Sequence, residues 1–181
     1  MEKITIENIV TTTQLKTELN IEQLARNIKD STYDPNEFPG LIIKYKLPKT
    51  VAIIFSNGKI ISTGAKNLDD SEDIINNTIK KIQEFENIIL PKTELKIQNI
   101  VASYEFGKKL NLSSISKKLM FENIEFFPDQ FLGLIYKNRN PDTTLIIFES
   151  GKIICTGAEN FDDIYSSINL LKDKLTSINV L

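Results

Sequence analysis

The chain has no histidine and only one cysteine, Cys155, among its 181 residues. The absence of histidine removes the usual zinc sites and every histidine-based catalytic arrangement, and a single cysteine cannot form an internal disulfide. The sequence also contains no recognisable pair of nucleophile and base, and no recurrent carboxylate cluster on its expected strands. We therefore expect no catalytic residues, no metal site, no cofactor and no enzyme activity.

Long apolar stretches are missing as well. No apolar run approaches the roughly 18 to 20 residues that span a bilayer, and MEKITIENIV lacks the basic segment and apolar core of a signal peptide. With 41% apolar residues the chain can nevertheless bury a substantial core. We expect a folded protein of the cytosol or the nucleus, without a membrane partner.

An excess of positive charge is also lacking, because 22 Lys and Arg face 24 Asp and Glu, for a net charge of −2. Nucleic-acid-binding proteins usually carry a basic excess, so the sum argues against such a partner. The charges are unevenly distributed along the chain, however, and local clusters of charge can matter more for binding than the net charge. The simpler alternative is that these charges form ordinary solvated faces. The basic clusters are Lys44, Lys46, Lys49 and Lys59, then Lys137, Arg139 and Lys152; the acidic ones are Asp69, Asp70, Glu72 and Asp73, then Asp162 and Asp163.

The most informative feature present is an internal duplication. FPGLIIKYKLPKTVAIIFSNGKIISTGAKNLDD, residues 38–70, returns as FLGLIYKNRNPDTTLIIFESGKIICTGAENFDD, residues 131–163, with 20 identities over 33 positions. IENIV at 6–10 likewise returns as IQNIV at 97–101. The sequence therefore predicts two copies of one fold.

Each copy has the same expected order of elements. A β-branched strand comes first, followed by a short helix for which Asn20 or Asn111 is the candidate N-cap. Three strands follow, at about 38–47, 50–56 and 59–64 in the first copy, with Asn57-Gly58 as a tight hairpin turn. A longer helix opens at Asp69-Asp70 or Asp162-Asp163. Its expected apolar stripe is Ile75, Ile79 and Ile82 in the first copy and Ile164, Ile168, Leu171, Leu175 and Ile178 in the second.

The two copies are expected to divide at residues 1–90 and 91–181 but to form one continuous body. The connection at 89–94 is short and is not rich in Gly or Ser, which favours one body over two independent beads on a linker.

The expected sheet has apolar side chains on both faces. Two helices per copy can cover only one face, so the other should be polar. In VAIIF and GKIIST it is not: if Ala52, Ile54 and Ile60 face the helices, then Ile53, Phe55 and Ile61 face away, with Thr63. A bare apolar face is usually an interaction site. A second copy of the chain, a ligand or a nucleic acid would each serve as its partner.

Duplicated motifs make the chain resemble the TATA-box-binding protein family. They are FPGL, IIF, SNGK and STGAK in one copy, and FLGL, IIF, ESGK and CTGAE in the other. The resemblance covers essentially the whole chain in register. It implies an α+β fold, a pseudo-symmetric saddle of two repeats, with a curved ten-stranded antiparallel sheet and four helices on the convex face. The concave face would lie in the minor groove of AT-rich promoter DNA.

The resemblance assigns DNA contacts residue by residue. Two phenylalanines per repeat would wedge between base steps, because a wedge must be apolar and flat. Polar donors amid an apolar wall would read A·T pairs, which offer only acceptors in the minor groove. Lysines would contact phosphates without reading sequence. The wedges are Phe38, Phe55, Phe131 and Phe148; the donors are Asn8, Thr63, Asn99 and Thr156; the wall is Val10, Ile53, Ile61, Val101, Ile146 and Ile154; the phosphate contacts are Lys44, Lys49, Lys59, Lys137 and Lys152.

The second copy departs from the pattern at several positions. Asp142 stands where the first copy has Lys49, Glu149 lies beside Phe148, and Leu132 replaces the proline found at position 39. The resemblance implies that an acidic segment before the phenylalanine of the second copy recruits transcription factor B; here NIEFFPDQF keeps Asp129 but has Phe127 at an expected acidic position. The negative charges of Asp142 and Glu149 are expected to weaken the phosphate contacts of this copy.

The function implied is general transcription initiation. The protein would bend TATA-box DNA and recruit transcription factor B and the RNA polymerase machinery, in the cytoplasm of an archaeon, or in the nucleus if the source is eukaryotic. The alternatives are an accessory domain of nucleic-acid processing and a dimerisation module that uses the apolar face. A weak homodimer in the absence of DNA is compatible with the first function.

Overall fold

The computed structural model describes residues 4–86, 94–119 and 123–181. They form two compact units, one of Asn8–Gln98 and one built mainly from Asn99–Leu181, which we call the N-terminal and C-terminal repeats. The expected boundary between residues 90 and 91 lies outside the described residues, as does the expected linker except for Glu94.

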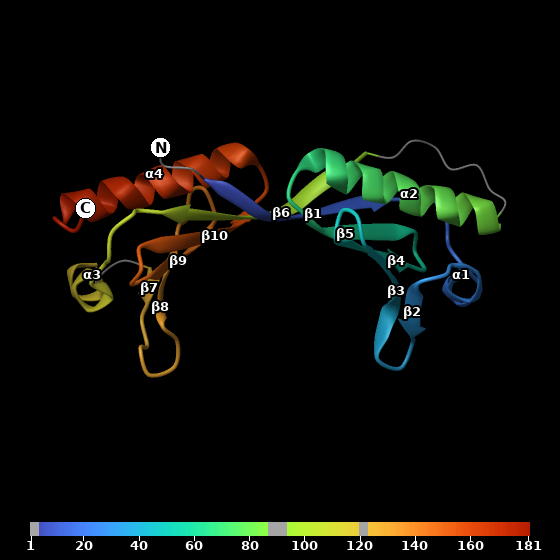
Figure 1. Ribbon diagram of the computed structural model, residues 1–181, viewed down its shortest axis with the longest axis horizontal. Coiled ribbons are helices and arrows are strands. Elements are labelled where there is room, and N and C mark those ends of the chain that lie inside the picture. The colour runs from blue at the N-terminus through green and yellow to red at the C-terminus, as the bar shows by residue number, and fades with distance from the viewer. Residues whose placement is uncertain (1–3, 87–93, 120–122) are drawn as a thin grey trace. The chain divides into compact units, whose positions relative to one another are not determined.

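The N-terminal repeat is a five-stranded antiparallel sheet with two helices (Figure 1). Its spatial strand order is β2-β3-β4-β5-β1, so the meander β3-β4-β5 lies between the short strand β2 and the long strand β1. In chain order the elements are β1 (Thr5–Gln14), α1 (Ile21–Asn27), β2 (Ser31–Asp34), β3 (Phe38–Tyr45), β4 (Thr50–Phe55), β5 (Lys59–Ala65) and α2 (Leu68–Glu86).

The C-terminal repeat has the same architecture, with strand order β6-β10-β9-β8-β7. Together, ten strands and four helices in the described part of the chain confirm the α+β class and the twofold repetition. β2 and β7 carry too few apolar residues to stand out in the sequence, and only the family resemblance implied five strands per repeat. The elements are β6 (Lys96–Glu105), α3 (Leu112–Lys118), β7 (Ile124–Glu125), β8 (Gly133–Lys137), β9 (Thr144–Phe148), β10 (Lys152–Ala158) and α4 (Phe161–Ser177).

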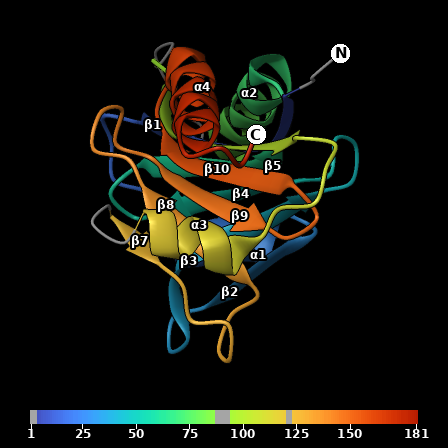
Figure 2. The same ribbon diagram turned by 90° about the vertical axis from the view of Figure 1, so that its left-hand side faces the viewer.

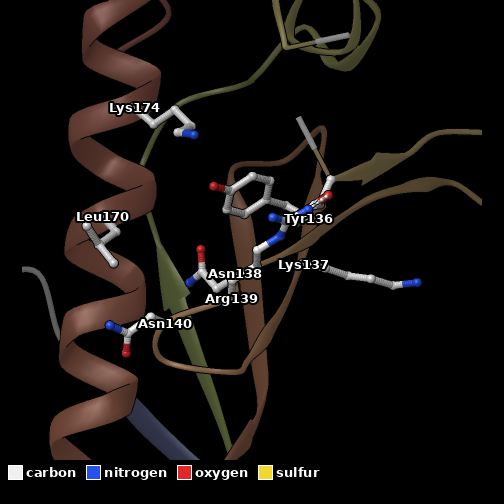
Figure 3. A pocket seen from close by; sticks show the side chains of 8 residues that line it. Tyr136, Lys137, Asn138, Arg139, Asn140, Leu170 and Lys174 are labelled. Carbon is white, nitrogen blue, oxygen red and sulfur yellow. Dashed lines mark hydrogen bonds between the residues drawn. The ribbon is translucent and has the colours of Figure 1, made fainter. Parts of the chain in front are cut away.

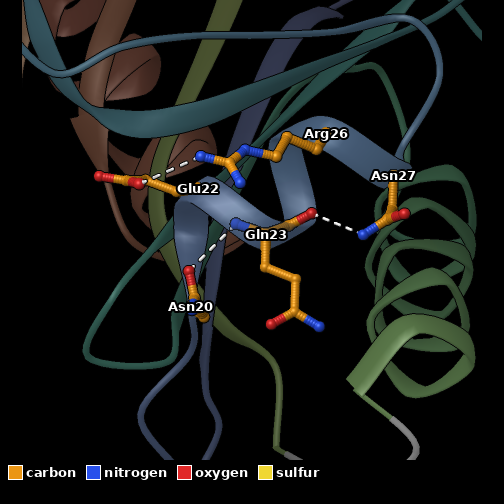
Figure 4. A network of polar contacts seen from close by, with 5 residues as sticks. All are labelled: Asn20, Glu22, Gln23, Arg26 and Asn27. Atoms are coloured by element: carbon orange, nitrogen blue, oxygen red, sulfur yellow. Dashed lines mark hydrogen bonds and ion pairs between the residues drawn. The ribbon is translucent and has the colours of Figure 1, made fainter.

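The predicted helix caps are confirmed. Asn20 Oδ1 accepts a hydrogen bond from the Gln23 amide at 3.0 Å (Figure 4), and Asn111 Oδ1 accepts one from the Ser114 amide at 2.8 Å. Such a bond satisfies one of the amide donors that the first helical turn leaves unpaired. Arg26 adds an exposed ion pair with Glu22, at 3.8 Å, one turn away in the same helix.

The long helices have caps that the sequence reading missed. Asn67 Oδ1 accepts from the Asp70 amide at 2.7 Å, and the Asn67 amide group donates to the Asp70 carboxylate at 2.9 Å. Asn160 and Asp163 repeat both bonds, each at 2.8 Å. The aspartates therefore complete reciprocal caps as well as placing negative charge at the helix N-terminus.

Both helices of each repeat pack on the same face of its sheet. α2 contacts β5 and β4, while α1 contacts β2, β3 and α2. Figure 2 shows α4 lying across β10, with α3 beside β8 and β7. The predicted stripes lie in these contacts, with two differences: Ile79 is only half-buried, and α4 ends at Ser177, so Ile178 is its C-cap.

The core of the N-terminal repeat lies between this helix-covered sheet face and its two helices. Burying each aliphatic side chain contributes about 1.5–3 kcal/mol to the free energy of folding. The helices therefore pack on the sheet face that carries these side chains. The core cluster includes Leu15, Leu24, Leu41, Ile43, Ile54, Ile60, Ile75 and Ile82.

Among the described helices, none is long and apolar enough to cross a membrane.

Candidate nucleic-acid interface

The opposite face of the N-terminal sheet is not covered by α1 or α2. Ala52, Ile54 and Ile60 are fully buried on the helix side, as predicted. Because side chains alternate along a strand, the residues between them project to the other face. That face carries the half-buried side chains of Asn8, Val10, Ile42, Val51, Ile53, Phe55, Ile61 and Thr63 and the exposed Lys44.

The C-terminal sheet has an equivalent uncovered face. Leu145, Ile147 and Ile153 are fully buried against α4 and α3, so their neighbours in sequence project away from the helices. The half-buried side chains on this uncovered face are Asn99, Val101, Ile135, Ile146, Phe148, Ile154 and Thr156. The structure thus brings the predicted wall, donor and wedge residues of each repeat onto one face of its own sheet.

A pair of phenylalanine rings stands at the outer part of each uncovered face. The ring centroids of Phe38 and Phe55 lie 5.9 Å apart with an interplanar angle of 68°. Those of Phe131 and Phe148 lie 6.2 Å apart at 66°. Phe38 is 38% exposed and Phe131 is 42% exposed, so neither pair is sealed in the core. Edge-to-face packing holds each pair together while leaving apolar surface open to solvent.

A glycine beneath each ring pair makes this packing possible. A Cβ atom on Gly40 would lie 2.6 Å from Cε1 of Phe38 and 2.8 Å from Cγ2 of Ile53. At Gly133 the corresponding contact with Cε1 of Phe131 is also 2.6 Å. Any side chain here would displace the rings. The repetition of these glycines in FPGL and FLGL is the sequence signal for this close approach.

The two asparagines are held in a fixed orientation by backbone amides. The Gly64 amide donates to Asn8 Oδ1 at 2.7 Å, and Asn8 Nδ2 donates to Thr63 Oγ1 at 3.1 Å. Asn99 has the same arrangement with Gly157, at 2.7 Å, and Thr156, at 3.3 Å. Because Oδ1 faces an N–H donor, the NH2 group is directed to the threonine and keeps a second hydrogen for another acceptor.

A β-bulge turns these glycine amides toward the asparagines. Two steps along β1, from Ile9 to Thr11, face three steps along β5, from Ala65 to Ser62, so β5 contains one extra residue. Gly64 within the bulge has φ of +97°, and its equivalent Gly157 has +94°. A side chain is strained in this conformation, which explains the glycine in both copies of the T-G-A motif.

The lysines border the uncovered faces but are not equivalent. Lys44, Lys49 and Lys59 are exposed in the N-terminal repeat. In the C-terminal repeat Lys152 is half-buried, and Lys137 forms an ion pair with Glu125 on the neighbouring strand β7. The position of Glu125 is occupied by Thr32 in the N-terminal repeat, since both stand opposite the same site of the adjacent strand. The lysines predicted to contact phosphate therefore differ between the repeats, because those of the N-terminal repeat are exposed, whereas in the C-terminal repeat one is half-buried and one is in an ion pair.

The only cysteine of the sequence belongs to the core. Cys155 is fully buried on the helix-covered side of β10, and this burial raises the pKa of its thiol to about 11. Hydrogen bonds with Ser167 and Thr143 act in the opposite direction and do not offset the burial. The thiol therefore stays protonated at neutral pH and is not a reactive site.

Comparisons with known proteins point to a single family. A family model described as "Transcription factor TFIID (or TATA-binding protein, TBP)" matches residues 3–85 and 94–178. The chain is 37% identical over 179 residues to the TATA-box-binding protein of Archaeoglobus fulgidus, covering 99% of this chain and 98% of the relative. It is 40% identical over 181 residues to that of Picrophilus torridus, covering 100% and 98%.

A solved structure agrees with the sequence comparisons. The Methanococcus jannaschii TBP matches with a TM-score of 0.88 and 34% identity, covering 97% of this chain and 99% of that one. The similarity extends over both repeats, each with its uncovered sheet face.

Proposed function

Because the chain belongs to the TATA-binding protein family, we propose that it is a transcription initiation factor that binds TATA-box promoter DNA. In this proposal the uncovered faces of both repeats bind the minor groove and the phenylalanine pairs kink the duplex. The kinked complex recruits transcription factor B and the RNA polymerase machinery. This takes place in the cytoplasm of an archaeal cell. The protein has no catalytic role.

The observation that carries the proposal is the exposed pair of rings in each repeat. Ring pairs such as Phe131 and Phe148 project from a sheet face that none of the described helices of the repeat covers, next to an aliphatic wall. An apolar wedge inserted between base steps replaces lost stacking and opens the minor groove against an apolar surface. A complex with DNA gains stability when this apolar surface is covered by the minor groove. Contacts with the phosphates alone would leave the apolar surface exposed to water.

The asparagine clusters support a preference for A·T pairs. Asn8 and Asn99 each present an amide NH2 next to a threonine hydroxyl, and the minor groove of an A·T pair offers only acceptors. A G·C pair adds an amino group that would press against the aliphatic wall. Donors surrounded by hydrocarbon therefore favour A·T-rich DNA.

Bending of a labelled duplex tests the proposal. A TATA-containing duplex with a donor and an acceptor dye at its two ends reports the bend as increased energy transfer. We expect the wild-type protein to bend this duplex and Phe131→Ala with Phe148→Ala to remove most of the bend. Phe85→Ala is the control, because Phe85 is 37% exposed and lies on α2, on the helix-covered side. Full bending by the double variant would refute the role of these rings.

The loop between β7 and β8 is the proposed contact for transcription factor B, as the family resemblance implies. It exposes Phe127 at 61% and contains the exposed Asp129. We expect Phe127→Ala to weaken recruitment of transcription factor B to a preformed DNA complex, with DNA binding unchanged. Asp34→Ala changes the equivalent position of the N-terminal repeat and is the control. Equal recruitment by both variants would exclude this loop.

A homodimer is the competing use of the same apolar faces. Sedimentation of the protein with and without A·T-rich duplex separates the two. We expect any self-association to be weak and to disappear when DNA is added, since both partners cover the same surface. A dimer that persists in high salt and ignores DNA would favour a dimerisation module instead.

A further inference from the structure

The segment that leads from β6 into α3 is strongly basic. Residues 106–119, FGKKLNLSSISKKL, contain four lysines and no acidic residue. The equivalent residues 15–28 of the N-terminal repeat, LKTELNIEQLARNI, contain two cations and two acids. Two of the differences lie side by side, because Lys108 and Lys109 occupy the positions of Thr17 and Glu18. The C-terminal repeat therefore has a local excess of positive charge that the N-terminal repeat lacks.

The start of this segment is fastened to the turn of the β9–β10 hairpin. The Phe106 amide donates a hydrogen bond to the Gly151 carbonyl at 3.0 Å, and the Leu110 amide donates one to the Glu149 carbonyl at 2.9 Å. Between these two bonds the backbone of Lys108 lies directly against the turn, because a Cβ atom on Gly151 would overlap the Lys108 carbonyl oxygen. The position of the segment relative to the hairpin is therefore fixed by backbone contacts.

The same hairpin carries two of the proposed DNA contacts. Phe148 is the last residue of β9, and Lys152 is the first residue of β10. Lys108 and Lys109 are both exposed beside the turn that joins them. Within the described part of the chain, neither ammonium group takes part in an ion pair or a hydrogen bond. Each is a compact charge on a flexible stem, which suits a contact with a phosphate.

The lysines already assigned to phosphates in this repeat each have an acidic neighbour. Figure 3 shows the side chain of Lys137 extending away from α4, and its ammonium group forms an ion pair with Glu125. Lys152 stands opposite Glu105 in the pairing of β6 with β10, whereas the equivalent position of β1 is the neutral Gln14. These acids offset part of the positive charge that the proposed DNA contact needs in the C-terminal repeat.

We infer that Lys108 and Lys109 contact phosphates of the bound duplex beside the base step at which Phe148 inserts; the inference rests on the proposed binding of TATA-box DNA. Because the hairpin that carries Phe148 fixes the segment, both lysine stems can reach the same stretch of DNA. Such contacts position the protein without reading sequence. They supply positive charge that the acids beside Lys137 and Lys152 offset. An acidic protein segment could also attract these lysines, but it would not require them to be fastened to a DNA-contacting hairpin.

Binding isotherms of the full-length protein with a TATA duplex at several salt concentrations test the inference. Lys108→Gln with Lys109→Gln should lower affinity about 5- to 30-fold at about 0.15 M salt, the value of one to two phosphate contacts. The slope of log affinity against log salt should become shallower by about 0.9 to 1.8. The control is Lys80→Gln with Lys117→Gln, which removes the same charge from α2 and from the last turn of α3. It should change affinity by less than about twofold, because salt screens charges beyond about 8 Å.

Lys108→Arg with Lys109→Arg keeps both charges and should retain the affinity and the salt slope of wild type. At saturating protein, the Gln pair should still bend the dye-labelled duplex fully, because its phenylalanine rings are unchanged. The inference is overturned if the Gln pair has the affinity and slope of the control pair, which would leave the lysines to an acidic protein partner. Loss of bending at saturation, or an Arg pair that binds as weakly as the Gln pair, would overturn it as well. A wild-type protein that does not bind the TATA duplex would instead refute the proposed function and this inference with it.

Discussion

The N-terminal and C-terminal repeats share an order of elements, a glycine under each ring pair and an asparagine held by a bulge, yet they differ in charge. Lys44 is exposed in the first repeat, whereas its equivalent Lys137 is paired with Glu125. Lys49 is replaced by Asp142, and Glu149 follows the second wedge. The shared features are those that geometry demands. The differing residues lie around the uncovered faces, where a change of charge would alter the proposed phosphate contacts without affecting the fold.

The largest expected consequence of this comparison is unequal salt dependence. Replacing Lys44, Lys49 and Lys59 by Gln should lower DNA affinity on the order of a thousandfold at low salt, since each contact contributes about 0.9 to the slope of log affinity against log salt. Replacing Lys137 and Lys152 by Gln should have a clearly smaller effect, and Glu125→Gln should increase affinity. Binding isotherms at several salt concentrations measure both slopes. An equal change in the salt slope for each lysine replaced in the two repeats would contradict the expected difference between them.

The asparagines should instead be equivalent between the repeats. Asn8→Asp and Asn99→Asp keep the oxygen that accepts from the Gly64 or Gly157 amide but replace the NH2 donor with an acceptor. We expect each to lower affinity for a TATA duplex by roughly 10- to 100-fold, the value of one base contact of about 1–3 kcal/mol. Unchanged melting temperatures would confirm that the fold is retained. A variant that binds normally would exclude its asparagine from base reading.

Gly40→Ala and Gly133→Ala should destabilise both repeats, with Gly40 more sensitive. The added Cβ meets Ile53 Cγ2 at 2.8 Å in the first repeat and Ile146 Cγ2 at 3.0 Å in the second, and an isoleucine gives way less easily than an exposed ring. Overpacking of this kind costs about 1–3 kcal/mol. Denaturant unfolding measures the loss, and energy transfer in the labelled duplex reports the displaced rings. Stability and bending equal to wild type would contradict this role.

The smallest difference concerns two equivalent core positions. Ser62 is fully buried, and its hydroxyl has no hydrogen-bond partner in the described residues, whereas Cys155 fills the same position in the other repeat. A buried hydroxyl without a hydrogen-bond partner destabilises the folded state, because its desolvation is not compensated. Ser62→Ala removes this hydroxyl and should therefore raise the free energy of unfolding by about 1 kcal/mol. Cys155→Ser should lower it by a similar amount. Urea unfolding measures both, and stabilisation by Cys155→Ser would show that the two sites are not comparable.

Much of the fold was predictable because it depends on local patterns. Asn20 and Asn111 signal helix starts by their side-chain oxygens, and Asn57-Gly58 signals a hairpin whose Gly58 amide bonds to Phe55 at 3.0 Å. Alternation identified Ala52 and Ile54 as inward-facing. The polar strand β2 and the two-residue strand β7 were not visible in the residues themselves, because their pairing comes from the neighbouring strand and not from their own composition.

The sequence predicted which side chains share an uncovered sheet face, but not the contacts that hold them there. Duplicated sequence selected Phe38, Phe55, Phe131 and Phe148, and the structure places each pair within 5.9 or 6.2 Å. The ion pair of Lys137 with Glu125 could not be foreseen, because the residues lie 12 apart in sequence and meet only through strand pairing. The same holds for the bond between Asn8 and Gly64, 56 residues apart.

The sequence by itself determined the duplication, the family and the alternation that leaves one sheet face apolar, since each is written in residue order and spacing. Only the tertiary structure decided how side chains distant in the chain meet. It oriented the asparagine amides through the Gly64 and Gly157 backbone and paired Lys137 with Glu125 across two neighbouring strands. The reason is physical: propensity and pattern act within a few residues, whereas hydrogen bonds, ion pairs and cavities depend on which strands and helices are adjacent.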